Sequence, residues 1–147
     1  MTSVVGVGKE LRGHGLLAWL RLARVFQKVE RYSSEHLREW DLNVAQFDVL
    51  ACVGAREGMM QQELADLLLV TKGNVCQLLD KMEGRGWISR RQRGRTNRLF
   101  LTDAGRRLFD EVVPAHEALI ARRFSALSEG ERVRLHELLR KLDNALD

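Results

Sequence analysis

The chain has 147 residues, of which 45% are hydrophobic and 30% are charged, and this balance predicts one soluble domain with a buried core. No apolar run reaches the roughly 20 residues of a membrane-spanning helix, and the first residues lack the pattern of a signal peptide, so we expect a cytoplasmic protein without a membrane partner. A single proline and little strand pattern favour a mainly helical fold.

The first predicted helix follows a short Gly-rich lead, residues 1–10, and extends from Leu11 to about Leu37. Its apolar stripe consists of Leu16, Leu20, Ala23, Phe26, Val29 and Leu37. Trp19, Leu22 and Val25 make this stripe wider than contacts within one chain require. We therefore expect a partner subunit to cover the excess.

Asn43 begins the next predicted helix, because Gln46 stands three residues later and completes a capping box. Its core-facing residues are Phe47, Leu50, Ala51 and Val53. Gly58 ends the connection that follows.

Two short helices come next, joined by very few residues. The first covers Gln61 to Leu68, with Leu64, Ala65 and Leu68 inward. The second begins at Thr71, whose hydroxyl can cap it, and turns Val75, Leu78, Leu79 and Met82 inward. Leu69 stands where such a turn often has glycine and implies a different turn. Because the connection is tight, the helices must cross, as in a helix-turn-helix.

The exposed face of the second helix carries the groups that read base edges in the major groove, since Asn and Gln bond adenine and Lys reaches guanine or phosphate. These residues are Lys72, Gly73, Asn74, Gln77 and Lys81. An ordinary solvated helix face has a similar composition. The segment that follows helps to choose between the two interpretations.

Gly84 and Gly86 end this helix, and Ile88–Arg91 and Arg98–Leu101 then form the two strands of a predicted hairpin with Gly94 and Asn97 in its loop. Six arginines and no acid lie in this region: Arg85, Arg90, Arg91, Arg93, Arg95 and Arg98. The chain has a net charge of +4, so the other residues sum to −2 and the basicity is local. With a pI near 9.5, this pattern indicates a protein that binds duplex DNA.

Thr102 caps the next predicted helix, whose apolar residues are Leu108, Phe109, Val112 and Val113. Pro114 must kink or interrupt this helix near residues 110–113, because its ring blocks the preceding turn. Ser128 and Glu131 form a second capping box and open the last helix. We expect Val133, Leu135, Leu138, Leu142 and Leu146 to face inward.

The stretch from Leu42 to Leu108 resembles the winged helix-turn-helix of the multiple antibiotic resistance regulator (MarR) family. The resemblance lies in QFDVL of the preceding helix, the QQELA and VTKGNV pair, LLDKMEGRGWI, and LTDAGRRL after the wing. It implies an obligate homodimer on a pseudo-palindromic operator, with residues 71–83 in the major groove and the wing at the adjacent minor groove.

The resemblance also assigns residues to roles. Lys72, Asn74 and Gln77 fall on the family's base-reading positions, and Arg95 falls on its wing-tip arginine. Arg93 stands where many members have an Asp that orients this arginine, which leaves the wing geometry open. The predicted DNA-binding residues are Gln61 and Gln62 on the first helix, Thr71, Lys72, Gly73, Asn74, Gln77 and Lys81 on the recognition helix, and Arg91, Arg93, Arg95 and Arg98 on the wing.

The expected fold is thus mainly α, a winged helix-turn-helix with a short β-hairpin wing. Residues 1–41 form an N-terminal dimerisation helix, residues 42–101 the DNA-binding lobe, and residues 102–147 the C-terminal helices that complete the dimerisation region. Across a twofold axis, two recognition helices roughly 34 Å apart would fit successive major grooves.

A small aromatic or phenolic anion is the effector that the resemblance implies, bound between the dimer helices and the lobe. Trp19, Phe26, Asp48 and Cys52 would line this site, with a nearby arginine taking a carboxylate. The alternative is that Trp19 and Phe26 belong only to the dimer core.

The predicted function is a sequence-specific regulator, a repressor released by its effector. One alternative is a DNA-binding protein without an effector, and another is a redox sensor that uses Cys76 or Cys52, although packing is the simpler interpretation of both thiols. A helix-turn-helix used only for protein contact is disfavoured by the uncompensated arginines.

We expect no catalysis, cofactor or metal. The sequence has no acid pair, Ser/His/Asp set or phosphate-cradling Gly loop. His14, His36, His116 and His136 lack metal-ligand spacing.

Overall fold

A computed structural model describes residues 5–6, 9–10, 12–68 and 72–147 of the chain. Its helices are α1 (His14–Leu37), α2 (Val44–Ala55), α3 (Gln61–Leu68), α4 (Lys72–Gly84), α5 (Asp103–Arg123) and α6 (Glu129–Ala145), with a 3₁₀ helix, η1 (Arg38–Trp40), between α1 and α2. Strands β3 (Met59–Met60), β5 (Thr96–Leu101) and β4 (Ile88–Arg93) form an antiparallel sheet in that order. Strands β1 (Val5–Gly6) and β2 (Lys9–Glu10) form a separate pair. The predicted mainly helical fold with a short hairpin is confirmed.

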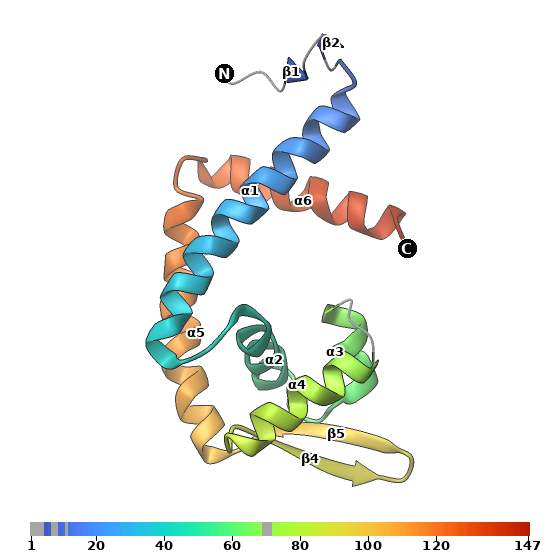
Figure 1. The fold of residues 1–147 in the computed structure, drawn as a ribbon, viewed down its shortest axis with the longest axis vertical. Helices are drawn as coiled ribbons and strands as arrows, with labels where there is room; N and C mark the ends of the chain where they lie inside the picture. The colour runs from blue at the N-terminus through green and yellow to red at the C-terminus, as the bar shows by residue number, and fades with distance from the viewer. Residues whose placement is uncertain (1–4, 7–8, 11, 69–71) are drawn as a thin grey trace.

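Figure 1 shows how these elements are arranged. A compact lobe contains α2, α3, α4 and the three-stranded sheet, and the hairpin of β4 and β5 projects from it. Helix α5 leaves the lobe and lies along α1, and α6 then crosses away from both. We call the β4–β5 hairpin the wing.

The core of the lobe is built from the helix faces that the apolar spacing predicts. Its buried residues come from α2, α3, α4 and the wing, and they are Val49, Leu50, Val53, Leu64, Ala65, Val75, Leu79, Met82, Ile88 and Leu99. Phe47, Cys52, Leu68 and Leu78 are partly buried against them. The inward faces expected for α3 and α4 are therefore confirmed.

Three predicted helix starts are confirmed by their hydrogen bonds. Asn43 accepts from the Gln46 amide at 2.8 Å, and Gln46 accepts from the Asn43 amide at 3.1 Å. Ser128 and Glu131 form the same reciprocal pair at the start of α6. Thr102 accepts from the Gly105 amide at 3.0 Å and caps α5. Each bond satisfies an amide that the helix itself cannot.

The C-terminal end of α1 is fastened to α5 by side-chain contacts. Nδ1 of His36 lies 3.1 Å from Nδ1 of buried His116, and the Trp40 indole donates to Glu111 at 3.1 Å. Burial and the neighbouring His36 ring lower the pKa of His116. Two histidines that are far apart in the sequence thus meet, yet the described residues include no group of three or more side chains suited to a metal ion.

The interruption expected at Pro114 is wrong, because α5 is continuous from Asp103 to Arg123. Proline removes one backbone hydrogen bond from the helix interior. The turns on either side are nevertheless held by the buried Val112, His116 and Leu119.

The expectation that the apolar residues of α6 face inward is wrong within a single chain. Val133, Leu138, Leu142 and Leu146 are 47% to 76% exposed, and only Leu135 is partly covered. The cause is the direction of α6, which crosses away from α1 and α5 and makes few contacts with the rest of the chain. No helix in the described ranges is both long and apolar enough to cross a membrane.

Gly105 should be essential for packing the start of α5 against the wing. A Cβ built there would lie 2.0 Å from the Trp87 carbonyl oxygen, so Gly105→Ala must displace backbone. We expect a loss of about 1–3 kcal/mol in the free energy of unfolding, measured by urea denaturation. Gly84→Ala is the matched control, because a Cβ there meets nothing within 4 Å. Equal stability of the two variants would contradict the close contact.

Candidate nucleic-acid interface

The helix pair at the centre of the lobe has the crossing that its sequence predicts. Ala65 and Leu64 of α3 are buried against Val75 of α4, and the small side chain of Ala65 allows a close approach. The connection through Leu69, Val70 and the predicted cap Thr71 lies outside the described residues. Lys72 is the first residue of α4, and its side chain is not described either.

The opposite face of α4 is exposed to solvent and carries the predicted base-reading groups. Gly73, Asn74, Gln77 and Lys81 are all exposed. Asp80, Glu83 and Cys76 are exposed on the same helix. The packing expected for Cys76 is therefore wrong.

A Schellman motif ends α4 and starts the wing. The amide of Trp87 donates to the Met82 carbonyl at 3.0 Å, and that of Gly86 donates to the Glu83 carbonyl at 2.9 Å. Gly86 has φ +79°, a conformation that glycine adopts without strain. The chain thus reverses directly from the recognition helix into β4.

The wing is longer and its turn tighter than predicted. Pairs extend from Ile88 opposite Leu101 to Arg93 opposite Thr96, so only Gly94 and Arg95 form the turn. Gly94 has φ +62°, which suits the first central position of a two-residue hairpin turn. The placement of Asn97 in the loop is wrong, because Asn97 lies in β5 opposite Gln92.

The six arginines of this region fall into different environments. Arg85 forms an ion pair with Asp41 and stacks on Trp87, with its guanidinium carbon 3.9 Å from the ring centroid. Arg90 forms ion pairs with both Asp80 and Glu83 of α4. Sequence reasoning missed these acids because they lie outside the hairpin, although their positions on α4, three residues apart, were visible.

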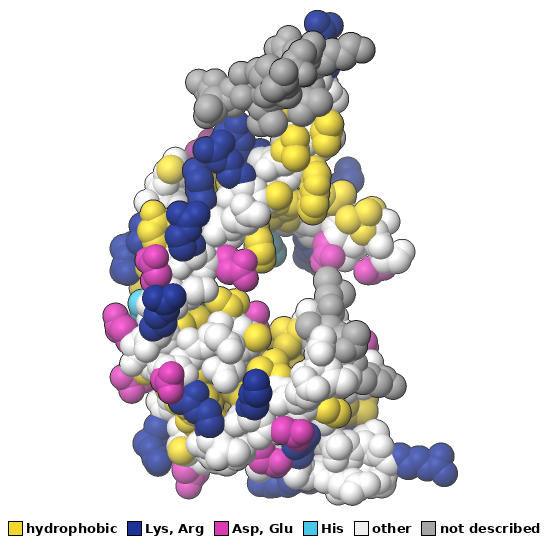
Figure 2. All heavy atoms as spheres, in the orientation of Figure 1, with side chains coloured by type: hydrophobic (Ala, Val, Ile, Leu, Met, Phe, Trp, Pro, Cys, Tyr) yellow, Lys and Arg dark blue, Asp and Glu magenta, His cyan; other side chains and the backbone are white. Residues whose placement is uncertain are grey.

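The remaining arginines supply the basic surface of the wing. Arg98 donates to the Gly58 carbonyl at 3.1 Å, and the guanidinium carbon of Arg91 lies 4.3 Å from the centroid of the Phe100 ring. Both side chains therefore already make contacts within the protein. Arg93 and Arg95 are exposed, and neither takes part in an ion pair among the described residues. Figure 2 shows a basic side chain extending from the tip of the wing.

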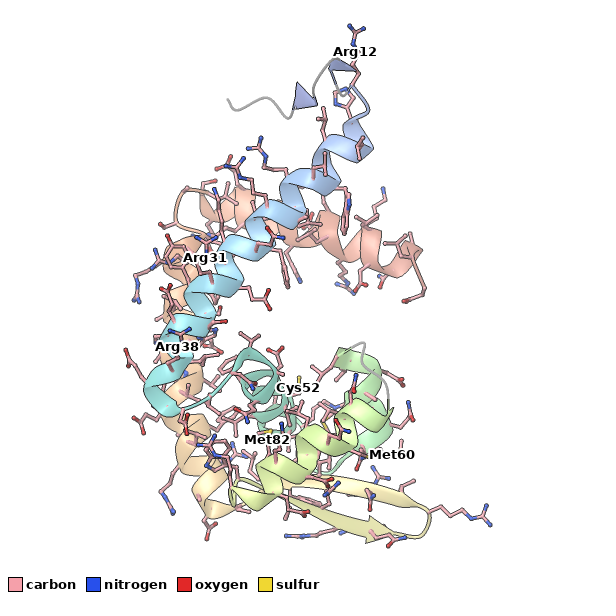
Figure 3. The ribbon with its side chains drawn as sticks, in the orientation of Figure 1. Arg12, Arg31, Arg38, Cys52, Met60 and Met82 are labelled. Carbon is pink, nitrogen blue, oxygen red and sulfur yellow. The ribbon has the colours of Figure 1, made fainter. Side chains whose placement is uncertain are left out.

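A groove of about 380 Å³ separates the helix pair from the wing. Its lining residues are Met60, Gln61, Gln62, Ala65, Val75, Cys76, Arg95, Thr96 and Asn97. Met60 is labelled in Figure 3 beside α3 and the wing. The predicted Gln61 and Gln62 thus line the same groove as the wing-tip Arg95, together with Thr96 and Asn97, which sequence reasoning did not select. Amide, hydroxyl and guanidinium donors at one groove are suited to a nucleic-acid backbone.

Two of the four residues predicted to line an effector site lie together. Asp48 and Cys52 are partly buried on α2, and Glu30 of α1 is close enough to act on Asp48. Burial, and then repulsion by Glu30, raises the pKa of Asp48. Burial and Asp48 together raise the pKa of the Cys52 thiol. A raised thiol pKa makes the reactive thiolate scarcer, which disfavours Cys52 as a redox sensor.

Trp19 and Phe26 project from α1 and are each 62% exposed. Within the described part of the chain, no ring contact or hydrogen bond joins either of them to Asp48 or Cys52. The predicted effector site stays a prediction, with Asp48 and Cys52 on α2 and with Trp19 and Phe26 exposed on α1.

Comparison with known proteins identifies relatives over most of the chain. The MarR family model matches residues 42–98. An uncharacterized HTH-type transcriptional regulator of Bacillus cereus is 35% identical over 129 residues, which cover 87% of this chain and 88% of that relative.

Solved structures of similar shape agree with this relationship. AbsC, a MarR family transcriptional regulator from Streptomyces coelicolor, superposes with a TM-score of 0.85 at 21% identity, covering 94% of this chain and 97% of its own. A mutant MarR from E. coli complexed with operator DNA superposes with a TM-score of 0.77 at 26% identity, covering 87% of this chain and 95% of its own. These relatives show that the chain belongs to the MarR family, whose members are transcriptional regulators and not enzymes.

Proposed function

We propose that this protein is a homodimeric repressor that binds a pseudo-palindromic operator and is released by a small aromatic effector. DNA binding is supported by the exposed amide side chains of Asn74 and Gln77 on α4 and by the exposed Arg93 and Arg95 of the wing, which form no ion pair among the described residues. Asn74 and Gln77 would read base edges in the major groove, while the wing arginines would neutralise phosphate.

Exposed apolar side chains on α1 and α6 support the proposal that the protein is a dimer. Side chains of α1 and α6 that a lone chain leaves in water include Leu16, Trp19, Phe26, Val133, Leu138, Leu142 and Leu146. Figure 2 shows hydrophobic side chains gathered where these two helices lie. A groove of about 590 Å³ lies between α5 and α6, and its apolar lining residues are Phe47, Ile120, Ala121, Phe124, Leu135 and Leu139. Contiguous apolar surface of this kind marks a protein interface, and a second copy would bury it symmetrically.

The negative charges beside α2 restrict the charge that the proposed effector can carry. Asp48 of α2 and Glu30 of α1 are both acidic, and burial together with the charge of Glu30 raises the pKa of Asp48. An aromatic carboxylate or phenolate placed there would add a third negative charge. We therefore propose a neutral phenol or similar aromatic molecule in place of the anion that the sequence suggested. A shift in melting temperature on adding phenol, absent with benzoate, would support this choice.

Oxidation of Cys76 is a second candidate signal, and its exposure on α4 favours it. Sγ of Cys76 lies 2.9 Å from Nε2 of Gln61 at the groove between α3 and the wing. An added oxygen at this sulfur would alter the surface that meets DNA. Peroxide treatment that weakens DNA binding by the unaltered protein but not by Cys76→Ser distinguishes this signal from an aromatic effector.

Variants of α4 and of the wing should affect DNA binding differently. We expect Asn74→Ala or Gln77→Ala to weaken binding to the operator by about 1–3 kcal/mol and to leave binding to a scrambled duplex nearly unchanged. Arg93→Gln or Arg95→Gln should weaken binding to both duplexes and reduce the salt dependence by about one counterion each. Fluorescence anisotropy over a range of salt concentrations measures both effects. Binding by the unaltered protein that is indifferent to sequence and salt together would refute the proposal.

Dimerisation can be tested at α6. Leu142 is 51% exposed in the single chain, and Leu142→Arg should place a charge within the proposed interface and dissociate the dimer. Sedimentation velocity measures the expected halving of the mass. Leu67→Arg is the control, because Leu67 is 57% exposed on α3, outside this interface. A dimer that survives Leu142→Arg unchanged argues against α6 as the contact.

Stability should respond to pH through Asp48. Because the folded chain holds this proton more tightly than the unfolded chain, ionising Asp48 lowers the free energy of unfolding as the pH rises through its raised pKa. We expect Asp48→Asn to melt at a higher temperature than the unaltered protein at pH 7, with the difference vanishing below about pH 4. Glu30→Gln should give a smaller gain in the same direction, since burial is the larger cause. Equal melting temperatures at pH 7 would contradict this account.

A further inference from the structure

Arg90 is the most constrained arginine of the wing. Its side chain is only 19% exposed, although it belongs to a strand that projects from the lobe. Its Nη2 lies 2.9 Å from a carboxylate oxygen of Glu83 and also forms an ion pair with Asp80. The backbone amide of Arg90 donates to the second carboxylate oxygen of Glu83 at 3.4 Å. Three hydrogen bonds therefore connect one residue of β4 to two residues of α4.

The two acids are placed in an unfavourable position for a DNA-binding helix. Asp80 and Glu83 stand three residues apart on α4 and remain 64% and 43% exposed. A neighbouring phosphate backbone would repel both carboxylates. Simple electrostatics thus predicts that the protein would bind DNA more tightly without them.

The arrangement of the three side chains indicates that these acids have a structural role, which is to orient Arg90. A guanidinium is planar and presents its donors in fixed directions, so a pair of acceptors fixes its orientation more narrowly than one acceptor does. Because Arg90 is in the wing and both acceptors are in the recognition helix, their contacts restrict rotation of the wing about its base. Partly exposed ion pairs add little to the free energy of unfolding, so geometry is their main contribution.

We propose that Arg90, held by Asp80 and Glu83, is a positioning residue that fixes the angle between α4 and the wing, so that both reach their grooves in one register. The inference rests on the proposed DNA-binding function. Arg90 itself makes no DNA contact. It acts through the position of Arg95 at the wing tip and of Gln77 on α4.

The test removes the acids and leaves every basic group in place. The double variant Asp80→Asn, Glu83→Gln is compared with the unaltered protein on two duplexes, one enriched by the unaltered protein from a random-sequence pool and one scrambled. We expect the ratio of the two affinities to fall about tenfold or more, because the enriched duplex is bound less tightly while the scrambled duplex is bound as well or better. Tighter binding to both duplexes with an unchanged ratio would overturn the proposal.

A second comparison approaches the same contact from the wing. Arg90→Gln and Arg93→Gln each remove one positive charge from β4, but only Arg90 is held by α4. Arg93→Gln should lower both affinities and keep their ratio, whereas Arg90→Gln should lower the ratio as well. Asp66→Asn, on α3, controls for the loss of an exposed acid that lies outside these ion pairs. Melting temperatures measured in parallel separate misplacement of the wing from unfolding.

These outcomes separate a failure of the proposed DNA-binding function from a failure of the positioning role of Arg90. If the unaltered protein enriches no sequence from the pool, the proposed function fails. If it enriches one and all variants keep the same ratio, only the positioning role of Arg90 fails.

Discussion

The rest of the structure depends on a backbone junction at the base of the wing. Thr102 donates its amide to the Trp87 carbonyl at 3.0 Å and its hydroxyl to the Gly86 carbonyl, and Gly105 lies so close to Trp87 that no side chain fits between them. Helix α4 ends, the wing begins and closes, and α5 starts within these residues. Helix α4 and the wing are therefore attached to α5 by main-chain groups, which leave little freedom of adjustment.

Fewer arginines near the wing are free of acidic partners than the sequence suggests. Arg85 and Arg90 are matched by acids from other elements, while Arg93 and Arg95 at the end of the wing are not paired among the described residues. The end of the wing thus carries positive charge that no described acid neutralises, and such charge attracts phosphate. In the proposed function, the amides of α4 discriminate between sequences and the wing arginines supply affinity, so the two tasks fall to different surfaces.

The sequence correctly predicts the structural features that depend on residues a few positions apart in the chain. The capping boxes at Asn43 and Ser128 and the inward faces of α3 and α4 follow from spacings of three and four residues. Side-chain contacts between different elements were not predicted, including Arg90 of β4 with Glu83 of α4 and His36 of α1 with His116 of α5. The position of Asn97 was missed because strand register depends on the tight turn at Gly94, and Leu142 was misplaced because periodicity identifies an apolar face without identifying what covers it.

The continuity of α5 through Pro114 has a mechanical consequence. At 1.5 Å per residue, its 21 residues make a rod about 31 Å long, fixed at one end to the wing and at the other to the turn before α6. A rotation of about 6° at one end moves the other by about 3.4 Å, the rise of one base pair. Repacking of a few degrees where α5 meets the distal helices would thus move its wing end by the rise of one base pair.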